Sequence, residues 1–227
     1  MCDVLRESLG DERGYAFLSG PSFAREIMLE LQTAVVIASD DMMLAKDLCD
    51  IVSSDSFRAL VGRDVIGVEV GGAVKNVIAL AAGIAEGLDL GTNAIAALVT
   101  RGVAEMSRIS LALGGRQSTL AGLSGVGDTF GTCFGPLSRN RSLGVRLGKG
   151  EKLKDILASS TQVAEGVDTA FALAELIKKR DRSFRVDLKF PIIFGMCEIL
   201  KGKIDPFDGM IDLMNTPLRS EAYDFYD

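Results

Sequence analysis

Residues 69–86 read Glu69-Val-Gly-Gly-Ala-Val-Lys75-Asn76-Val-Ile-Ala-Leu-Ala-Ala-Gly83-Ile-Ala-Glu86, and Lys75 is the only charged side chain between the two glutamates. So apolar a stretch favours a long buried helix, from Val65 or Glu69 to Leu88. An ammonium in such a helix is costly to desolvate unless it has a partner or a function. Two interpretations stay open on these residues alone: Lys75 extends its head to water, or it acts as a proton-transfer group.

The pattern of secondary structure changes near Asp64. Before it, strands and helices alternate, and after it almost every segment has a helical pattern. The predicted strands are Tyr15–Ser19, Thr33–Ala38 and Phe57–Val61, and the predicted helices between them are Met1–Leu9, Ala24–Leu31 and one that Asp40 or Asp41 caps and that runs to about Ser53. We therefore predict two units, a truncated α/β unit over residues 1–63 and an all-helical unit over residues 64–227.

The helical unit has clear start signals. Thr92 is expected to cap a helix over Asn93–Leu113, and Pro191 and Pro206 stand where helix starts tolerate proline. The other expected helices are Ser138–Leu147, Leu153–Ser159, Val167–Lys179, Pro191–Lys201 and Pro206–Met214. Gly71, Gly72 and Gly83 lie inside the first long helix, where each costs about 1 kcal/mol relative to alanine. We expect another helix or a ligand to approach there.

Composition narrows the function. The net charge of −6 gives no general basic surface for nucleic acid, although Arg139, Arg141 and Arg146 form a local cluster suited to a small anion. The sequence contains no histidine, and its four cysteines form no C-x-x-C pair, so we predict no metal site, no disulfide framework and a reducing compartment. The longest uninterrupted apolar run, Val77–Ala85, is short for a membrane span, and no targeting segment is apparent.

Three glycine- or arginine-containing motifs follow. Gly122-Leu-Ser-Gly-Val-Gly-Asp128 and Gly144-Val-Arg-Leu-Gly148 fail as nucleotide fingerprints, because their spacing and context are wrong. Ser138-Arg139-Asn140 is better placed, since Ser138 can cap a helix whose first turn would bind a phosphate. Asp128 is either a helix N-cap or a carboxylate that pairs with a cationic acid.

Several motifs occur in a fixed order: Gly20-Pro-Ser-Phe-Ala24, Val68-Glu-Val-Gly-Gly-Ala-Val-Lys75-Asn76, Gly122-Leu-Ser-Gly-Val-Gly-Asp128, Ser138-Arg-Asn-Arg141 and Val163-Ala-Glu165-Gly166. Together they resemble the NAD(P)-dependent sn-glycerol-3-phosphate dehydrogenases of bacteria and plastids, over about residues 16–214. The resemblance implies a mainly α protein, in which the remnant of a Rossmann domain precedes an all-α domain like that of 6-phosphogluconate dehydrogenase.

The resemblance also implies roles for individual residues. Lys75 would be the proton donor and acceptor, and the substrate-binding residues would be Lys75, Asp128, Ser138, Arg139 and Asn140. The residues lining the cofactor, NAD or NADP, would be Gly20, Ser22, Ala24, Arg139, Val163 and Glu165. The substrate pair would be dihydroxyacetone phosphate and sn-glycerol 3-phosphate, used for glycerolipid synthesis by a homodimer in the cytoplasm or plastid stroma, with no nucleic acid or membrane partner.

One departure from the family pattern is large. The family's glycine-rich fingerprint, its first strands and a second substrate-binding lysine would all precede Met1, so we expect little activity and uncovered sheet edges in residues 1–227 alone. A non-catalytic phosphate-binding or oligomerisation module is the alternative. Relatives acting on 3-hydroxyacids or 6-phosphogluconate share the architecture, but Ser138-Arg-Asn-Arg141 favours a phosphorylated substrate.

Overall fold

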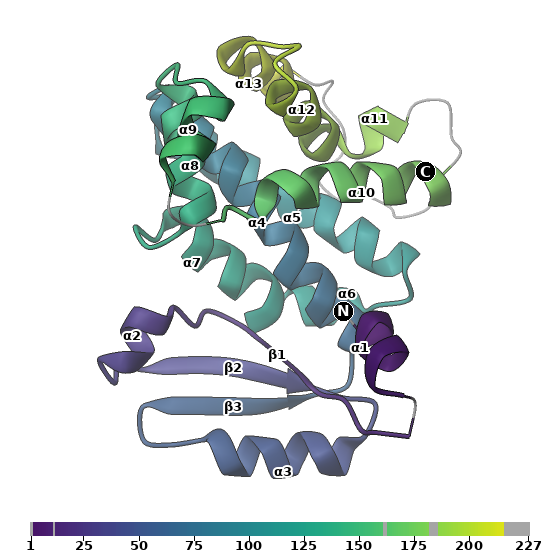
Figure 1. Ribbon diagram of the computed structural model, residues 1–227. Coiled ribbons are helices and arrows are strands. Elements are labelled where there is room, and N and C mark those ends of the chain that lie inside the picture. Colours follow the sequence, from purple (N-terminus) through teal and green to yellow (C-terminus); the bar gives the residue numbers. More distant parts are fainter. Residues whose placement is uncertain (1, 11, 161–162, 182–185, 216–227) are drawn as a thin grey trace.

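The structure is a computed structural model, and it describes all residues except 1, 11, 161–162, 182–185 and 216–227 (Figure 1). Met1, which we expected to begin the first helix, lies outside the described residues. The first part of the chain, called here the sheet unit, consists of α1 (Cys2–Leu9), β1 (Phe17–Ser19), α2 (Ala24–Met28), β2 (Thr33–Ala38), α3 (Met42–Val52) and β3 (Phe57–Gly62). This order confirms the predicted alternation of strands and helices.

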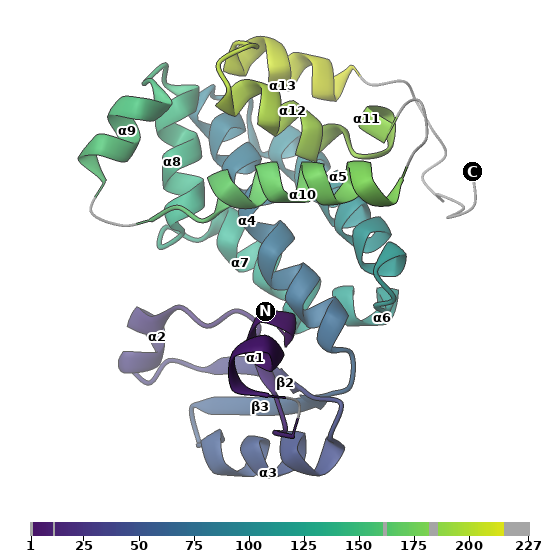
Figure 2. The same ribbon diagram turned by 45° about the vertical axis from the view of Figure 1, so that its right-hand side comes forward.

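The rest of the described chain, called here the helical unit, contains only helices and turns. Its elements are α4 (Val65–Gly87), α5 (Thr92–Ala112), α6 (Gln117–Leu120), the π-helical turn η1 (Leu123–Gly127), α7 (Asp128–Phe134), α8 (Arg139–Gly148), α9 (Leu153–Ser159), α10 (Gly166–Arg180), α11 (Val186–Lys189), α12 (Pro191–Leu200) and α13 (Pro206–Met214). Figures 1 and 2 show this unit on one side of the sheet, with the first turns of α4 reaching the strands.

The sheet has three strands in the order β1-β2-β3, with β1 antiparallel to β2 and β2 parallel to β3. The β-branched central strand β2 places Val35 and Ile37 in the interior, and α3 packs on β3 and β2. A small core joins Ala38 of β2 to Val65 and Val68 of α4. The sheet therefore completes its core with side chains from the helical unit.

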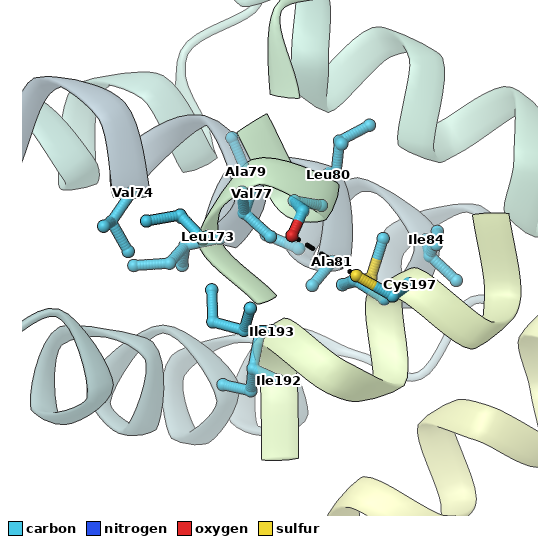
Figure 3. Packing of buried hydrophobic residues seen from close by; sticks show 14 of the residues in the cluster. Val74, Val77, Ala79, Leu80, Ala81, Ile84, Leu173, Ile192, Ile193 and Cys197 are labelled. Carbon is cyan, nitrogen blue, oxygen red and sulfur yellow. Dashed lines mark hydrogen bonds between the residues drawn. The ribbon is translucent and has the colours of Figure 1, made fainter. Parts of the chain in front are cut away.

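Helix α4 is the centre of the helical unit. Its side chains Val74, Val77, Leu80 and Ile84 are fully buried, and α5, α7, α8 and α10 surround it. Figure 3 shows these side chains packed against α10 and α12, where the Cys197 thiol donates to the main-chain oxygen of Ala170. Within the described residues α4 is long and apolar enough to cross a membrane, which the short apolar run had not suggested, but most of that stretch is buried inside the protein.

Two glycine pairs allow α4 and α8 to approach closely. A Cβ on Gly83 would collide with the main-chain oxygen of Arg141, and one on Gly87 with that of Val145. In the opposite direction, Gly144 faces the main chain of Leu80 and Gly148 that of Ile84. The prediction of close approach is confirmed for Gly83, and also for Gly71, which lies against the main chain of Ser124, whereas Gly72 has only the Ser19 hydroxyl near it. The spacing of Gly144 and Gly148 thus serves helix packing.

Helix α12 has no capping side chain of its own, because its N-cap residue is Phe190. Glu105 of α5 supplies the cap from a distance: its two carboxylate oxygens accept hydrogen bonds from the main-chain N–H groups of Ile192, at 2.8 Å, and Ile193, at 3.1 Å. Glu105 is completely buried, and this burial raises its pKa to about 7, against the lowering effect of the two N–H groups and of Arg108. The carboxylate therefore joins α5 to α12 inside the core.

The structure corrects several predictions. Helix α5 begins at Thr92 with Gly91, at φ +83°, as its N-cap, so Thr92 is not the cap. The helices α6, α7 and α11 and the turn η1 were not predicted. The glycines of residues 122–127 are typical of a loop, which hides η1 in the sequence. Strand β1 begins at Phe17 and α2 ends at Met28, so both elements are shorter than predicted.

Candidate active site

Lys75 of α4 and Asp128 of α7 form an ion pair beside Gly20, the residue that follows strand β1. The Lys75 ammonium donates to Oδ2 of Asp128 at 2.5 Å, and the two side chains are 22% and 6% exposed. The interpretation in which Lys75 extends its head to water is therefore wrong. The ammonium has a nearly buried carboxylate as its partner, while part of the lysine side chain stays accessible to a ligand.

The turn before α7 places Asp128 next to Lys75. The π-helical turn η1 leads directly into α7, whose first residue is Asp128. This turn fits because glycines replace side chains at its contacts: Gly71 of α4 lies against Ser124, and Gly125 lies against Leu120. Turns of this kind are frequent at functional sites. The motif Gly122–Asp128, which does not match a nucleotide-binding fingerprint, therefore positions the Asp128 carboxylate.

Asp128 is not a helix N-cap, which corrects that interpretation, since its side chain turns to Lys75. The hydroxyl of Thr132, one turn further along α7, donates to the main-chain oxygen of Asp128 at 2.6 Å and lies 3.4 Å from Oδ1. Burial raises the pKa of Asp128, whereas the Lys75 ammonium, Thr132 and the main-chain N–H of Gly20 lower it. Thr132 was not among the predicted site residues, although its i, i+4 spacing to Asp128 could have indicated it.

The start of α8 has the geometry expected of an anion site. Ser138 is the N-cap, and its hydroxyl accepts a hydrogen bond from the N–H of Arg141 at 3.2 Å, which confirms the predicted cap. Arg139 is exposed and lines a hollow of about 470 Å³ between α8 and α9. Arg141 pairs with Glu86 and Arg146 with Glu151. Of the predicted cluster, Arg139 alone has no ion-pair partner among the described residues.

Asn140 points into the protein, whereas Arg139, the residue before it, is exposed. Its amide nitrogen donates to Oδ1 of Asn76 at 2.9 Å, and its own Oδ1 accepts from the main-chain N–H of Gly166 at 2.9 Å. Both carboxamides are buried. Asn76 was not among the predicted site residues, and its position directly after Lys75 was the available signal. The motifs around Lys75, Arg139 and Glu165 are thus connected by hydrogen bonds.

The residues expected to line a cofactor fall into two groups. Gly20 is buried beside Asp128, and the hydroxyl of Ser22 donates to the Gly20 main-chain oxygen at 3.0 Å, which forms a tight turn before the exposed Ala24. Val163 and Glu165 are exposed on the segment that leads into α10. Ala24, Val163 and Glu165 are therefore accessible to a bound molecule. No group of three or more metal-binding side chains occurs among the described residues.

Two family models match the chain. The model of the NAD-dependent glycerol-3-phosphate dehydrogenase C-terminus matches residues 64–210, and the model of the N-terminus of the same family matches residues 1–45.

Curated and solved proteins agree with these matches. A glycerol-3-phosphate dehydrogenase [NAD(P)+] from Syntrophotalea carbinolica is 49% identical over 97% of the chain, and a chloroplastic glycerol-3-phosphate dehydrogenase [NAD(+)] from rice is 44% identical over 98%. The crystal structure of glycerol-3-phosphate dehydrogenase from Coxiella burnetii covers 94% of the chain with a TM-score of 0.88 and 38% identity. The chain spans 65%, 49% and 64% of these three proteins, respectively.

Proposed function

Because the chain belongs to the NAD-dependent glycerol-3-phosphate dehydrogenase family, we propose that its site holds the phosphate and transfers the proton when dihydroxyacetone phosphate and sn-glycerol 3-phosphate are interconverted. The observation that carries this proposal is the Lys75–Asp128 pair, which combines a partly accessible ammonium with a nearly buried carboxylate. We also propose that residues 1–63 belong to the cofactor-binding domain and residues 64–227 form the substrate-binding domain.

Lys75 is the proton-transfer group in this proposal. Its Nζ donates a proton to the C2 oxygen of the ketone as the alcohol forms, and it takes the proton back in the reverse reaction. The hydrogen bond to Asp128 fixes the direction of the ammonium, and Thr132 in turn supports Asp128. When bound, the NAD(P) cofactor supplies or accepts the hydride at C2.

Arg139 and the N-terminus of α8 hold the substrate phosphate. A guanidinium and the unpaired N–H groups of a first helical turn attract an anion, and Arg139 is not neutralised by a carboxylate among the described residues. Fixing the phosphate there would set the position of the C2 oxygen relative to Lys75. Arg139, Val163 and Glu165 together with the Gly20–Ala24 turn are the residues that would contact the cofactor.

Binding of glycerol 3-phosphate to residues 1–227 tests the phosphate site. We expect isothermal titration calorimetry to detect binding, and we expect Arg139→Ala to weaken it about tenfold or more. The matched control is Arg146→Ala. Arg146 lines the same hollow, but Glu151 already neutralises its charge. Equal affinity of Arg139→Ala and the unmodified chain would show that the phosphate binds elsewhere.

The proton-transfer role needs a protein that turns over. We expect little or no turnover by residues 1–227 alone, which span 65% of the Syntrophotalea relative. The test therefore joins this chain to the preceding part of that relative. In such a protein Lys75→Met should lower kcat by about 10²–10⁴-fold. Unchanged kcat in Lys75→Met would refute the assignment, and phosphate binding without turnover in the joined protein would favour the non-catalytic module.

Three broader features are also proposals. The relatives are named as NAD(P)+ and NAD(+) enzymes, so we propose NAD or NADP as the cofactor. One relative is chloroplastic, so we propose a plastid location beside a cytoplasmic one. Assembly as a homodimer is a third proposal. Size-exclusion chromatography with light scattering on the joined protein would test the dimer.

A further inference from the structure

Two buried carboxamides connect three segments that are far apart in sequence. The main-chain N–H of Gly166 donates to Oδ1 of Asn140, the amide nitrogen of Asn140 donates to Oδ1 of Asn76, and the amide nitrogen of Asn76 donates to the main-chain oxygen of Gly72 at 3.2 Å. Asn76 and Asn140 are 8% and 7% exposed. The result is one chain of hydrogen bonds from α10 through α8 to α4.

The direction of this chain is fixed by both of its ends. The Gly166 N–H can only donate, so the oxygen of Asn140 must face it and the nitrogen of Asn140 must face Asn76. The Gly72 carbonyl can only accept, which independently requires the nitrogen of Asn76 on that side. Reversing either carboxamide would oppose two donors or two acceptors in a buried site, where unsatisfied polar groups are costly.

The bond to Gly166 also caps a helix. Gly166 is the first residue of α10, and the N-cap residue Glu165 provides no side-chain hydrogen bond. Asn140 therefore satisfies an N–H that α10 leaves unpaired, from another helix. Because Gly166 directly follows Val163–Glu165, this cap sets where the proposed cofactor-side segment enters α10.

We propose that Asn76 is a positioning residue: it orients the Asn140 carboxamide, which in turn holds the start of α10. The functional part of this inference rests on the proposed function, because the neighbours of the three linked residues are Lys75, Arg139 and Glu165. On this arrangement Asn140 has one amide N–H left to donate, so it suits an oxygen acceptor of the substrate. The phosphate side and the cofactor side of the site then move as one unit.

Amide hydrogen exchange at Gly166, measured by NMR on residues 1–227, tests the positioning role. The main chains of Asn76 and Gly166 lie close together, but the Gly166 N–H donates to Asn140, so the Asn76 side chain can affect this N–H only through Asn140. Asn76→Ala removes the acceptor for Asn140, so Gly166 should exchange about tenfold faster relative to the core amides of α4. Asn76→Asp keeps the acceptor oxygen for Asn140 but sets a second oxygen opposite the Gly72 carbonyl, so Gly166 should exchange faster than in the unmodified chain and clearly more slowly than in Asn76→Ala. Ser107→Ala, at a buried polar position of α5 outside the network, is the matched control and should leave Gly166 unchanged.

Two outcomes would overturn the proposal: an unchanged Gly166 rate in Asn76→Ala, or an equally fast rate in Asn76→Ala and Asn76→Asp. If Asn76→Ala does not fold, the unmodified chain can still test the proposal. NMR should then detect a scalar coupling across the hydrogen bond from the Asn140 side-chain amide to the Asn76 side-chain carbonyl. Its absence would contradict the orientation argued above.

A ligand titration separates positioning from a purely structural role. Glycerol 3-phosphate should slow Gly166 exchange in the unmodified chain and in Asn76→Asp, and leave the rate in Asn76→Ala unaffected. Binding that leaves Gly166 equally unaffected in all three proteins would refute the coupling. If the unmodified chain binds no glycerol 3-phosphate, the proposed function is refuted. The positioning role is then still tested by the Gly166 exchange rates measured without ligand.

Discussion

The sheet unit and the helical unit bury their apolar side chains to very different extents. The helical core extends from α4 through α5, α8, α10 and α12, with many side chains fully enclosed. The sheet unit has the small core around Ala38, which α4 completes, and it leaves large apolar side chains exposed: Leu18, Met28, Leu29, Leu31, Met43, Ile51, Leu60 and Val61. This difference indicates that the stability of the chain comes from the helical unit, and that the sheet unit presents a surface suited to further packing.

The largest effect is expected where the helical core depends on one buried carboxylate. Glu105→Ala leaves the N–H groups of Ile192 and Ile193 without partners and opens a void, so it should lower the free energy of unfolding by about 4 kcal/mol. Urea denaturation followed by circular dichroism measures this change. Glu175→Ala, the same substitution at an exposed position of α10, should change it by less than about 0.5 kcal/mol.

The glycine contact between α4 and α8 should give the next largest effect. Gly83→Ala places a methyl group against the main chain of Arg141 and should cost about 3 kcal/mol. Gly72→Ala, in the same helix, meets only the Ser19 hydroxyl and should be neutral or stabilise by up to about 1 kcal/mol. Equal melting temperatures for the two variants would show that α4 and α8 can separate without cost.

The pH dependence of stability should report on the helical unit alone, because Glu105, whose pKa is raised, lies in the core of that unit. Its pKa of about 7 in the folded protein lies above the ordinary value of 4.5, so the folded state binds the proton more tightly than the unfolded state. The free energy of unfolding should therefore fall by about 2–3 kcal/mol as pH rises from about 4.5 to 7, and then level off. Denaturation at several pH values should show this fall as the difference between the unmodified chain and Glu105→Gln, and a constant difference would contradict it.

The smallest effect is expected in the sheet unit. Met28 is 82% exposed, so Met28→Ala should change the free energy of unfolding by less than about 0.5 kcal/mol. Met196, which is fully buried in α12, is the matched position in the helical unit, and Met196→Ala should cost about 2–5 kcal/mol. Similar losses in the two variants would mean that the sheet unit packs as firmly as the helical core.

Features set by neighbouring residues could be predicted from the sequence. Strand β2 matches Thr33–Ala38, Asp41 caps α3, and Ser138 caps α8, because β-branched runs and capping hydroxyls or carboxylates act over a few residues. For Asp128 the sequence left a helix N-cap and a carboxylate paired with a cationic acid both open, and the contact with Lys75 matches the second.

Features set by distant residues could not be predicted. The starts of α10 and α12 are capped by Asn140 and Glu105, which lie 26 and 87 residues away from the groups they bind. No local pattern distinguishes such a buried side chain from an ordinary polar one. The turn η1 was not predicted because it depends on contacts between distant segments: Gly125 of η1 lies against Leu120 of α6, and Gly71 of α4 lies against Ser124 of η1.

Helix α4 carries both Lys75 and the glycines that contact α8, so the number of residues between them sets where Lys75 lies. Gly83 fixes the rotation and the axial position of α4 against α8, and Lys75 lies eight residues earlier on the same helix. One residue inserted between them would turn Lys75 by about 100° around the helix axis and move it by about 1.5 Å. The ammonium would then face away from Asp128 even though every motif was still present. The number of residues between Lys75 and Gly83 is therefore as much a part of the site as the residues themselves.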